Sequence, residues 1–173
     1  MTHEQPPGPS SGRVGTNDLE SLRGTALDKA EQAELLEAQV ECTLTFLDDR
    51  GWPAGVVMLF VFVGGRFWLT SVEGRAQVRA LARDDRTTVV VSSVGSPLRG
   101  RRMTAVQGHA EIHRDAETKS WFLDVFSRRV EPRNSEAFRR QLDSPKRVVI
   151  EVVPTKVAVS HDNRKVTGRS SGR

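Results

Sequence analysis

The spacing of apolar residues changes after Gln39, and the change separates a helix from a series of strands. Between Thr25 and Gln39, Leu27, Leu35 and Leu36 recur at helical spacing and give one apolar face. Thr25 precedes this face and is a candidate N-cap, because its hydroxyl can accept a hydrogen bond from a free backbone N–H. The pattern predicts a helix from Thr25 to Gln39.

Strand patterns follow directly. Residues 41–47 alternate apolar and polar positions, and residues 54–63 are apolar enough to predict a strand that is buried on both faces. Gly64 and Gly65 separate this run from residues 66–70. Two adjacent glycines supply the positive φ angles of a tight turn, so we expect a hairpin whose second strand returns antiparallel.

The second half continues with short strands and short helices. It predicts a helix between Gly74 and Asp85, strands at 87–94 and 103–113 with an irregularity at Gly108, helices capped by Asp115 and Ser135, and a last strand at 147–159 interrupted at Pro154. Strands and helices do not alternate as in a doubly wound sheet. We therefore predict a mainly β fold with α: a split β-barrel of about six antiparallel strands with short flanking helices.

Composition predicts one domain with polar ends. Residues 1–17 are rich in Pro, Gly and Ser, and residues 162–173 are polar and basic, so neither end buries enough apolar surface to offset its ordering entropy. We expect disordered tails at 1–17 and 162–173 around a domain at 18–161. The longest apolar run is too short to span a membrane, and the N-terminal segment lacks the features of a secretory signal, which predicts a cytoplasmic protein. The single cysteine, Cys42, is expected to be a small buried residue on a strand.

Charge is unevenly distributed. Residues 1–86 carry 9 basic and 13 acidic residues, a net −4, whereas residues 87–173 carry 17 basic and 9 acidic residues, a net +8. A basic half can attract nucleic acid or an anionic cofactor. The densest basic cluster, residues 99–102, is not interleaved with the aromatic residues that stack on bases, so a nucleic-acid partner is not expected.

Three metal-ligating residue types alternate along the strand predicted at 103–113: His109, Glu111 and His113. On a strand, residues four apart are separated by about 13 Å, too far for both histidines to reach one ion. We therefore predict no metal site and interpret these residues as a solvated strand face. No nucleophile elbow, P-loop or Rossmann turn is present in the sequence, and no catalytic acid or base is identified.

The order of elements resembles a known superfamily. The segment from Phe67 to Arg86, FWLTSVEGRAQVRALARDDR, leads into a valine-rich strand; AVQGHAEI begins at Ala105, and VVIEVVPTKV begins at Val148. Together they resemble the pyridoxamine 5'-phosphate oxidase-like superfamily over roughly residues 25 to 160. Its members bind FMN or a deazaflavin, coenzyme F-420, on a split barrel, in a groove between two subunits.

The resemblance implies a site. The cofactor ring is expected near Met58, Leu59 and Thr70, and its phosphate is expected on Ser71 and on Arg75, which would be the main cation, with Gln77 and Arg79 nearby. Guanidinium groups and helix N-termini both suit phosphates. The alternative reading is that Arg75, Arg79 and Arg83 form a solvated helix face.

Departures from the superfamily pattern narrow the expected function. Gln77 stands where the superfamily loop carries a lysine, the strand at 56–63 lacks the arginine and lysine of the true oxidases, and the C-terminal Trp and Arg motif is absent. The resemblance thus implies a homodimeric FMN- or deazaflavin-dependent oxidoreductase that transfers a hydride to or from a small organic substrate, and not a true pyridoxamine phosphate oxidase. The alternative is a non-catalytic split barrel, either a flavin carrier or a haem binder with a ligand such as His161.

Overall fold

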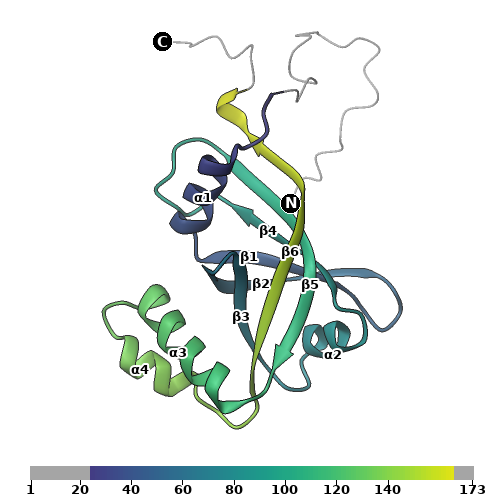
Figure 1. Cartoon of the computed structure of the whole chain (residues 1–173), viewed down its shortest axis with the longest axis vertical. Helices are drawn as coiled ribbons and strands as arrows, with labels where there is room; N and C mark the ends of the chain where they lie inside the picture. The colour runs from purple at the N-terminus through teal and green to yellow at the C-terminus, as the bar shows by residue number, and fades with distance from the viewer. Residues whose placement is uncertain (1–23, 166–173) are drawn as a thin grey trace, which may run out of the picture.

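Six antiparallel strands close into a barrel in the computed structural model, which describes residues 24–165 (Figure 1). The order around the barrel is β1-β2-β3-β6-β5-β4, and β4 pairs back with β1. The strands are β1 (Glu41–Leu47), β2 (Pro53–Val63), β3 (Arg66–Val72), β4 (Arg86–Ser92), β5 (Arg102–His113) and β6 (Arg147–Asp162). The predicted fold class is confirmed. The tail predicted at 1–17 lies outside the described residues.

Helices cover the two ends and one side of this barrel. They are α1 (Lys29–Ala38), α2 (Ala76–Arg83), α3 (Ala116–Val130) and α4 (Ser135–Leu142), followed near the C-terminus by a 3-10 helix, η1 (Asn163–Lys165). Figure 1 shows α1 at one end of the barrel, α2 toward the other end, and α3 beside α4. None of the helices in residues 24–165 is long and apolar enough to cross a membrane.

Two predicted caps are wrong and one is confirmed. The N-cap of α1 is Asp28, not Thr25. The Asp28 carboxylate accepts from the Glu31 N–H, and the Glu31 carboxylate accepts from the Asp28 N–H. This capping box fixes the start of the helix at Lys29. Asn134 is the N-cap of α4, so Ser135 is already its first helical residue. Asp115 caps α3 as predicted, accepting from the Thr118 N–H at 2.7 Å.

The glycine hairpin is confirmed. Gly64 and Gly65 have φ angles of 62° and 76°, and Val63 pairs with Arg66 across the turn. Positive φ at both central residues matches the right-handed twist of the two strands, which is why glycine suits both positions.

The prediction that residues 54–63 are buried on both faces is wrong. Exposure alternates along β2, with Phe60 fully buried inside the barrel and Val57 66% exposed on the outside. Only the C-terminal part of the outer face is covered, because Leu59 and Val61 pack against the α3 side chains. Val57 therefore belongs to an uncovered sheet face, whereas its neighbour Val56 packs against the barrel core.

Two apolar clusters hold the fold together. The larger fills the barrel interior with side chains from all six strands and is closed at the ends by Leu35 of α1 and Leu81 of α2. The smaller lies between α3 and the outer face of β2 and β6, around Val61, Phe122 and Val149. The helices thus complete cores that the sheet alone leaves open.

The irregularity predicted at Gly108 is confirmed. The pairing of β5 with β6 shifts twice, between Ala105 and Val106 and between Gln107 and Gly108, and Gly108 lies opposite Pro154. A Cβ atom at Gly108 would lie 2.4 Å from the Val153 carbonyl oxygen. Only glycine allows the two backbones to approach this closely.

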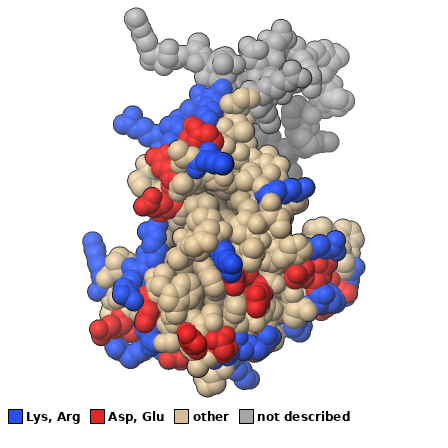
Figure 2. All heavy atoms as spheres, viewed as in Figure 1, with Lys and Arg blue, Asp and Glu red and all other residues tan. Residues whose placement is uncertain are grey.

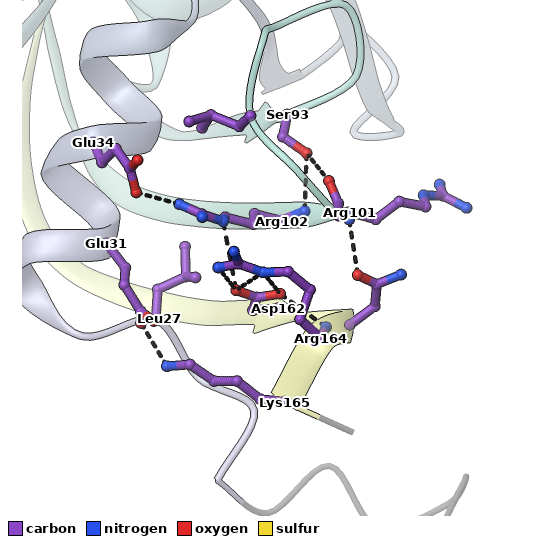
Figure 3. A network of polar contacts seen from close by, with 12 residues as sticks. Leu27, Glu31, Glu34, Ser93, Arg101, Arg102, Asp162, Arg164 and Lys165 are labelled. Carbon is purple, nitrogen blue, oxygen red and sulfur yellow. Dashed lines mark hydrogen bonds and ion pairs between the residues drawn. The ribbon is translucent and has the colours of Figure 1, made fainter. Parts of the chain in front are cut away.

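The boundary predicted for the C-terminal tail is placed too early. Asp162 ends β6 with a fully buried side chain and forms an ion pair with Arg164 of η1. Arg102 lies 3.5 Å from the Asp162 carboxylate and also pairs with Glu34 of α1, as Figure 3 shows. Buried charges need such partners, so residues up to Lys165 belong to the folded domain. Residues 166–173 lie outside the described residues.

Candidate functional site

The loop between β3 and α2 forms a turn with an open helix N-terminus. Gly74, with a φ of 82°, turns the chain, and Arg75 occupies the N-cap position of α2 without any side-chain capping bond. The first N–H groups of a helix have no partner within the helix, so without a cap they remain available to another acceptor. This end of α2 therefore offers N–H donors and the positive end of the helix dipole.

The hydroxyl groups at the end of β3 have defined partners. Thr70 Oγ1 donates to the Val148 carbonyl oxygen at 2.9 Å, which turns this hydroxyl toward β6. The Ser71 side chain is buried, and its oxygen accepts from Gln77 Nε2 at 3.1 Å. Gln77 therefore joins the first turn of α2 to the end of β3, and the structure brings these two predicted residues together.

The three arginines of α2 have different surroundings. Arg83 donates to Asp49 at 2.6 Å and to the carbonyl oxygens of Leu47 and Asp48. Arg79 lies 3.7 Å from Asp49 and donates to the Gly74 carbonyl oxygen. Within residues 24–165 no partner is found for the exposed Arg75 guanidinium. The reading of one solvated arginine face is therefore too simple.

Arg83 and Arg79 instead clamp the β1–β2 turn. The hydrogen bond from the Arg83 guanidinium lowers the pKa of Asp49, which keeps its carboxylate ionised against both arginines. Arg79, predicted beside the phosphate, is already engaged with this turn, whereas Arg75 is free to receive an anion. Of the two predicted cations, only Arg75 has a guanidinium without a partner among residues 24–165.

Of the three residues predicted near the cofactor ring, the two on β2 point to opposite faces of that strand. Met58 packs inward on the barrel core, opposite Cys42, whereas Leu59 faces outward toward α3. The β2–β3 register places Leu59 one step beyond the Phe60–Leu69 pair, on the same outer face as Thr70. A ligand on the outer face would contact Leu59 and Thr70 but not the Met58 side chain. Cys42 is buried as predicted, and burial raises the pKa of its thiol to about 12.

An apolar stripe crosses the outer face of the sheet, which the sequence analysis did not find. We call it the outer stripe; it consists of residues that pair with one another across neighbouring strands, namely Val57, Thr43, Val90, Ala105 and Val159. Val57 is 66% exposed and Val159 is 52% exposed, so both ends of the stripe lie open. The alternation of apolar and polar residues indicates which residues of each strand face outward. Only the pairing register shows that these five lie side by side across the sheet.

Much of the face seen in Figure 2 is uncharged. Uncharged surface covers large parts of β5 and β6, which lie in front in the matching ribbon view, although basic and acidic side chains also lie near the middle of this face. Exposed Val153 and Val157 of β6 contribute to this surface. An uncharged sheet face of this kind is typical of a surface that packs against another subunit.

Hollows in the barrel surface lie away from the predicted loop. One of about 410 Å³ lies between β1, β4 and β5, and one of about 300 Å³ lies between α1 and β6. Neither is lined by Ser71 or Arg75. The α2 loop is therefore an open ledge, meaning that no other part of the described chain faces it across a pocket. A binding site enclosed on both sides would need a second protein surface there.

The histidines and the basic cluster take separate positions. His109 pairs with Asp85 at 3.0 Å, whereas His113 Nε2 lies 2.7 Å from the Glu151 carboxylate. His113 is mostly buried, so the reading of a solvated strand face is wrong for this residue. Arg102 of the basic cluster is buried as well, which leaves fewer cations for nucleic acid than its sequence suggests. His161 lines a hollow of about 330 Å³ together with Arg101.

Solved structures share this fold. A conserved hypothetical protein from Mycobacterium tuberculosis matches with a TM-score of 0.73 and 20% identity, covering 88% of this chain and 96% of its own. An F420 reductase matches with a TM-score of 0.54 and 24% identity, covering 72% and 94%. The haem storage protein HutZ from Vibrio cholerae matches with a TM-score of 0.61 and 13% identity, covering 79% and 97%. No curated protein matches the chain.

The amino-acid sequence also matches a protein-family model. The model described as pyridoxamine 5'-phosphate oxidase matches residues 28–161, which spans the barrel from α1 to the end of β6. The resemblance predicted from the loop and strand motifs is thereby confirmed. With its closed six-stranded antiparallel barrel, the chain belongs to the pyridoxamine 5'-phosphate oxidase family.

Proposed function

We propose that this protein is a flavin- or deazaflavin-dependent oxidoreductase that acts as a homodimer on a small organic substrate. The observation that carries the proposal is the N-terminus of α2, which has no side-chain cap and bears Arg75, a guanidinium without a partner among residues 24–165. Family membership adds support, and one fold neighbour is an F420 reductase.

The residues present fit the phosphate of FMN or of coenzyme F-420. Arg75 supplies a charge and several donors, and the free N–H groups of α2 supply further donors. The Ser71 hydroxyl oxygen accepts a hydrogen bond from Gln77, so the hydroxyl proton of Ser71 is free to be donated to a ligand. When bound, the isoalloxazine or deazaflavin ring supplies the hydride chemistry. Thr70 lies on the outer face beside which a ring would rest, whereas Leu59 on the same face is already packed against α3.

A second subunit would complete this ledge. The outer stripe is apolar, exposed at Val57 and Val159, and close to the strands that carry Leu59 and Thr70. Packing two such faces together would bury these valines and place a wall beside the open α2 loop. Exclusion of water from the ring would then come from apolar side chains of both copies.

The test is a titration of the purified protein with FMN and, separately, with coenzyme F-420, followed by fluorescence. We expect binding to one of them in the micromolar range or below. Arg75→Ala should weaken binding roughly tenfold or more, as expected for the loss of one charge-assisted hydrogen bond. Gln77→Lys should tighten it by adding a cation where the superfamily carries one.

Arg140→Ala is the matched control, because Arg140 is an exposed arginine on α4 that pairs only with Glu136 among the described residues. Its binding should equal that of the unmodified protein. Absence of binding to both cofactors, or equal binding by Arg75→Ala, would remove the basis of the proposal. Reduction of an added acceptor by the loaded protein then separates an enzyme from a flavin carrier.

A second candidate is a non-catalytic haem binder. The observation in its favour is His161, which lines a hollow of about 330 Å³ beside Arg101, a cation suited to a propionate. A fold neighbour is a haem storage protein. Haemin added to the protein should then give a Soret band that His161→Ala abolishes; without that band, this candidate is rejected.

A further inference from the structure

A carboxylate pair and an imidazole meet on the outer face of β5 and β6, beside Trp68 of β3. Glu111 and Glu151 lie directly opposite each other in the antiparallel register, and His113 lies next to them on β5. One ligand atom from each of the three side chains lies within 4.8 Å of the other two. Glu111 and His113 are two apart on β5, and Glu151 lies across from them on β6, so their side chains can reach one ion. His109 and His113 are four apart on one strand and cannot.

The balance of charge at this cluster is incomplete. Carboxylates directly opposite each other on a sheet repel, and the Glu151 side chain is only 3% exposed, which strengthens the repulsion. Arg66 pairs with one oxygen of Glu151, and His113 Nε2 lies 2.7 Å from the other. No partner is found for the Glu111 carboxylate among residues 24–165. Two negative groups therefore share one point beside an imidazole nitrogen.

We propose that Glu111, His113 and Glu151 bind a divalent transition-metal ion, with Zn²⁺ as the best match. Imidazole nitrogen with carboxylate oxygen is a ligand set that Zn²⁺ takes at about 2.0–2.2 Å, whereas Mg²⁺ and Ca²⁺ prefer oxygen alone. Two carboxylates and a neutral imidazole balance the charge of the ion. Three protein ligands leave a fourth position for water, as in open zinc sites.

The surroundings already hold two of the ligands in place. Arg66 donates a hydrogen bond to the Glu151 oxygen that does not face His113. In metal sites, such a hydrogen bond to the non-coordinating oxygen orients the carboxylate ligand. The His113 ring packs against Trp68 at 5.7 Å, and Trp68 packs in turn against Trp121 at 4.8 Å. Glu111 is exposed, so its side chain is free to rotate onto the ion. Ligand atoms of a tetrahedral Zn²⁺ site lie about 3.3 Å apart. Binding would therefore draw in the ligand atoms that now lie up to 4.8 Å apart and would open the 2.7 Å contact between His113 and Glu151.

The experiment is calorimetric titration of tag-free, chelator-treated protein with Zn²⁺. We expect one Zn²⁺ per chain with a dissociation constant in the micromolar range or below, and at least a tenfold loss of affinity in Glu111→Gln and in His113→Gln. Titration with Co²⁺ gives a second readout, because a paramagnetic ion beside Trp68 should quench tryptophan fluorescence in the unmodified protein but not in Glu111→Gln.

His109→Ala is the matched control, since His109 lies on the same strand but pairs with Asp85. It should bind Zn²⁺ as the unmodified protein does. Glu111→Gln changes only an exposed side chain, so it keeps the test decisive even if His113→Gln proves unstable. Absence of binding, unchanged binding in Glu111→Gln, or an equal loss in His109→Ala would overturn the proposal. None of these outcomes depends on whether a flavin binds at α2.

Discussion

Gly108 shows how strongly one residue can constrain this barrel. It lies where β6 gains an extra residue relative to β5, opposite Pro154, and its backbone approaches the β6 backbone closely. The Val153 carbonyl oxygen and the Val152 side chain would lie 2.4 Å and 3.0 Å from an added Cβ atom. Backbone atoms of a central strand pair cannot move aside as a flexible side chain can.

Gly108→Ala should therefore lower the free energy of unfolding by about 1–3 kcal/mol, the usual range for overpacking in a close-packed core. Denaturant unfolding followed by circular dichroism measures it. Gly55→Ala is the comparison, because the atom nearest to an added Cβ there is the Thr43 methyl group at 3.1 Å, and the nearest backbone atom is 3.8 Å away, at ordinary van der Waals distance. Equal losses in the two variants would show that the backbone approach at Gly108 has no special cost.

At the scale of elements, a buried ion network joins α1, β5, β6 and η1 (Figure 3). Asp162 is its centre, with Arg164 at 2.5 Å, Arg102 at 3.5 Å, and Glu34 bound to Arg102 from α1. The hydrogen bond from Arg164 lowers the pKa of Asp162. A carboxyl group whose pKa is lowered by folding stabilises the fold above its unfolded pKa and loses that effect as the pH falls through the folded pKa.

Asp162→Asn should reduce stability at neutral pH by roughly 1–3 kcal/mol, because charge-assisted hydrogen bonds are replaced by neutral ones around two arginines. The difference between the variant and the unmodified protein should shrink as the pH is lowered toward the acid range. Thermal unfolding over a series of pH values tests this. A difference that stays constant down to strongly acidic pH would mean that Asp162 does not carry the acid dependence.

At the scale of the whole molecule, the single chain is incomplete on one face. The outer stripe is exposed at Val57 and Val159, and the candidate phosphate loop is a ledge without a facing wall. Both features have one explanation, which is the proposed pairing of two copies through the sheet.

Val57→Arg should therefore convert a dimer into a monomer, measured by size-exclusion chromatography with light scattering. Stability of the isolated barrel should change by only about 0.5 kcal/mol, because the side chain is on the surface of the single chain. Val94→Arg is the matched control, since Val94 is also 66% exposed but lies in the loop after β4. A monomeric unmodified protein, or dissociation by both variants, would contradict the proposed dimer face.

Local patterns in the sequence determined the elements and the family. The glycine pair, the Asp115 cap, the irregularity at Gly108 and the loop from Thr70 to Arg75 are recognisable because turn geometry and capping depend on neighbouring residues alone. These local patterns were enough to predict a barrel of about six antiparallel strands. The exposure of Val57 was not predictable in the same way, because burial depends on what lies across the sheet.

Tertiary structure decided which side chains meet. Sequence spacing correctly separated His109 from His113, but only the β5–β6 register brings Glu151 to His113 and Glu111. Folding likewise turns Arg79 to Asp49 while leaving Arg75 free, and it buries Asp162 among cations although its neighbours in the sequence are polar. The His113–Glu151 contact joins residues 38 positions apart, and the Arg102–Glu34 contact joins residues 68 positions apart. Their geometry follows from how strands pair around the closed barrel, and a linear pattern carries no record of that register.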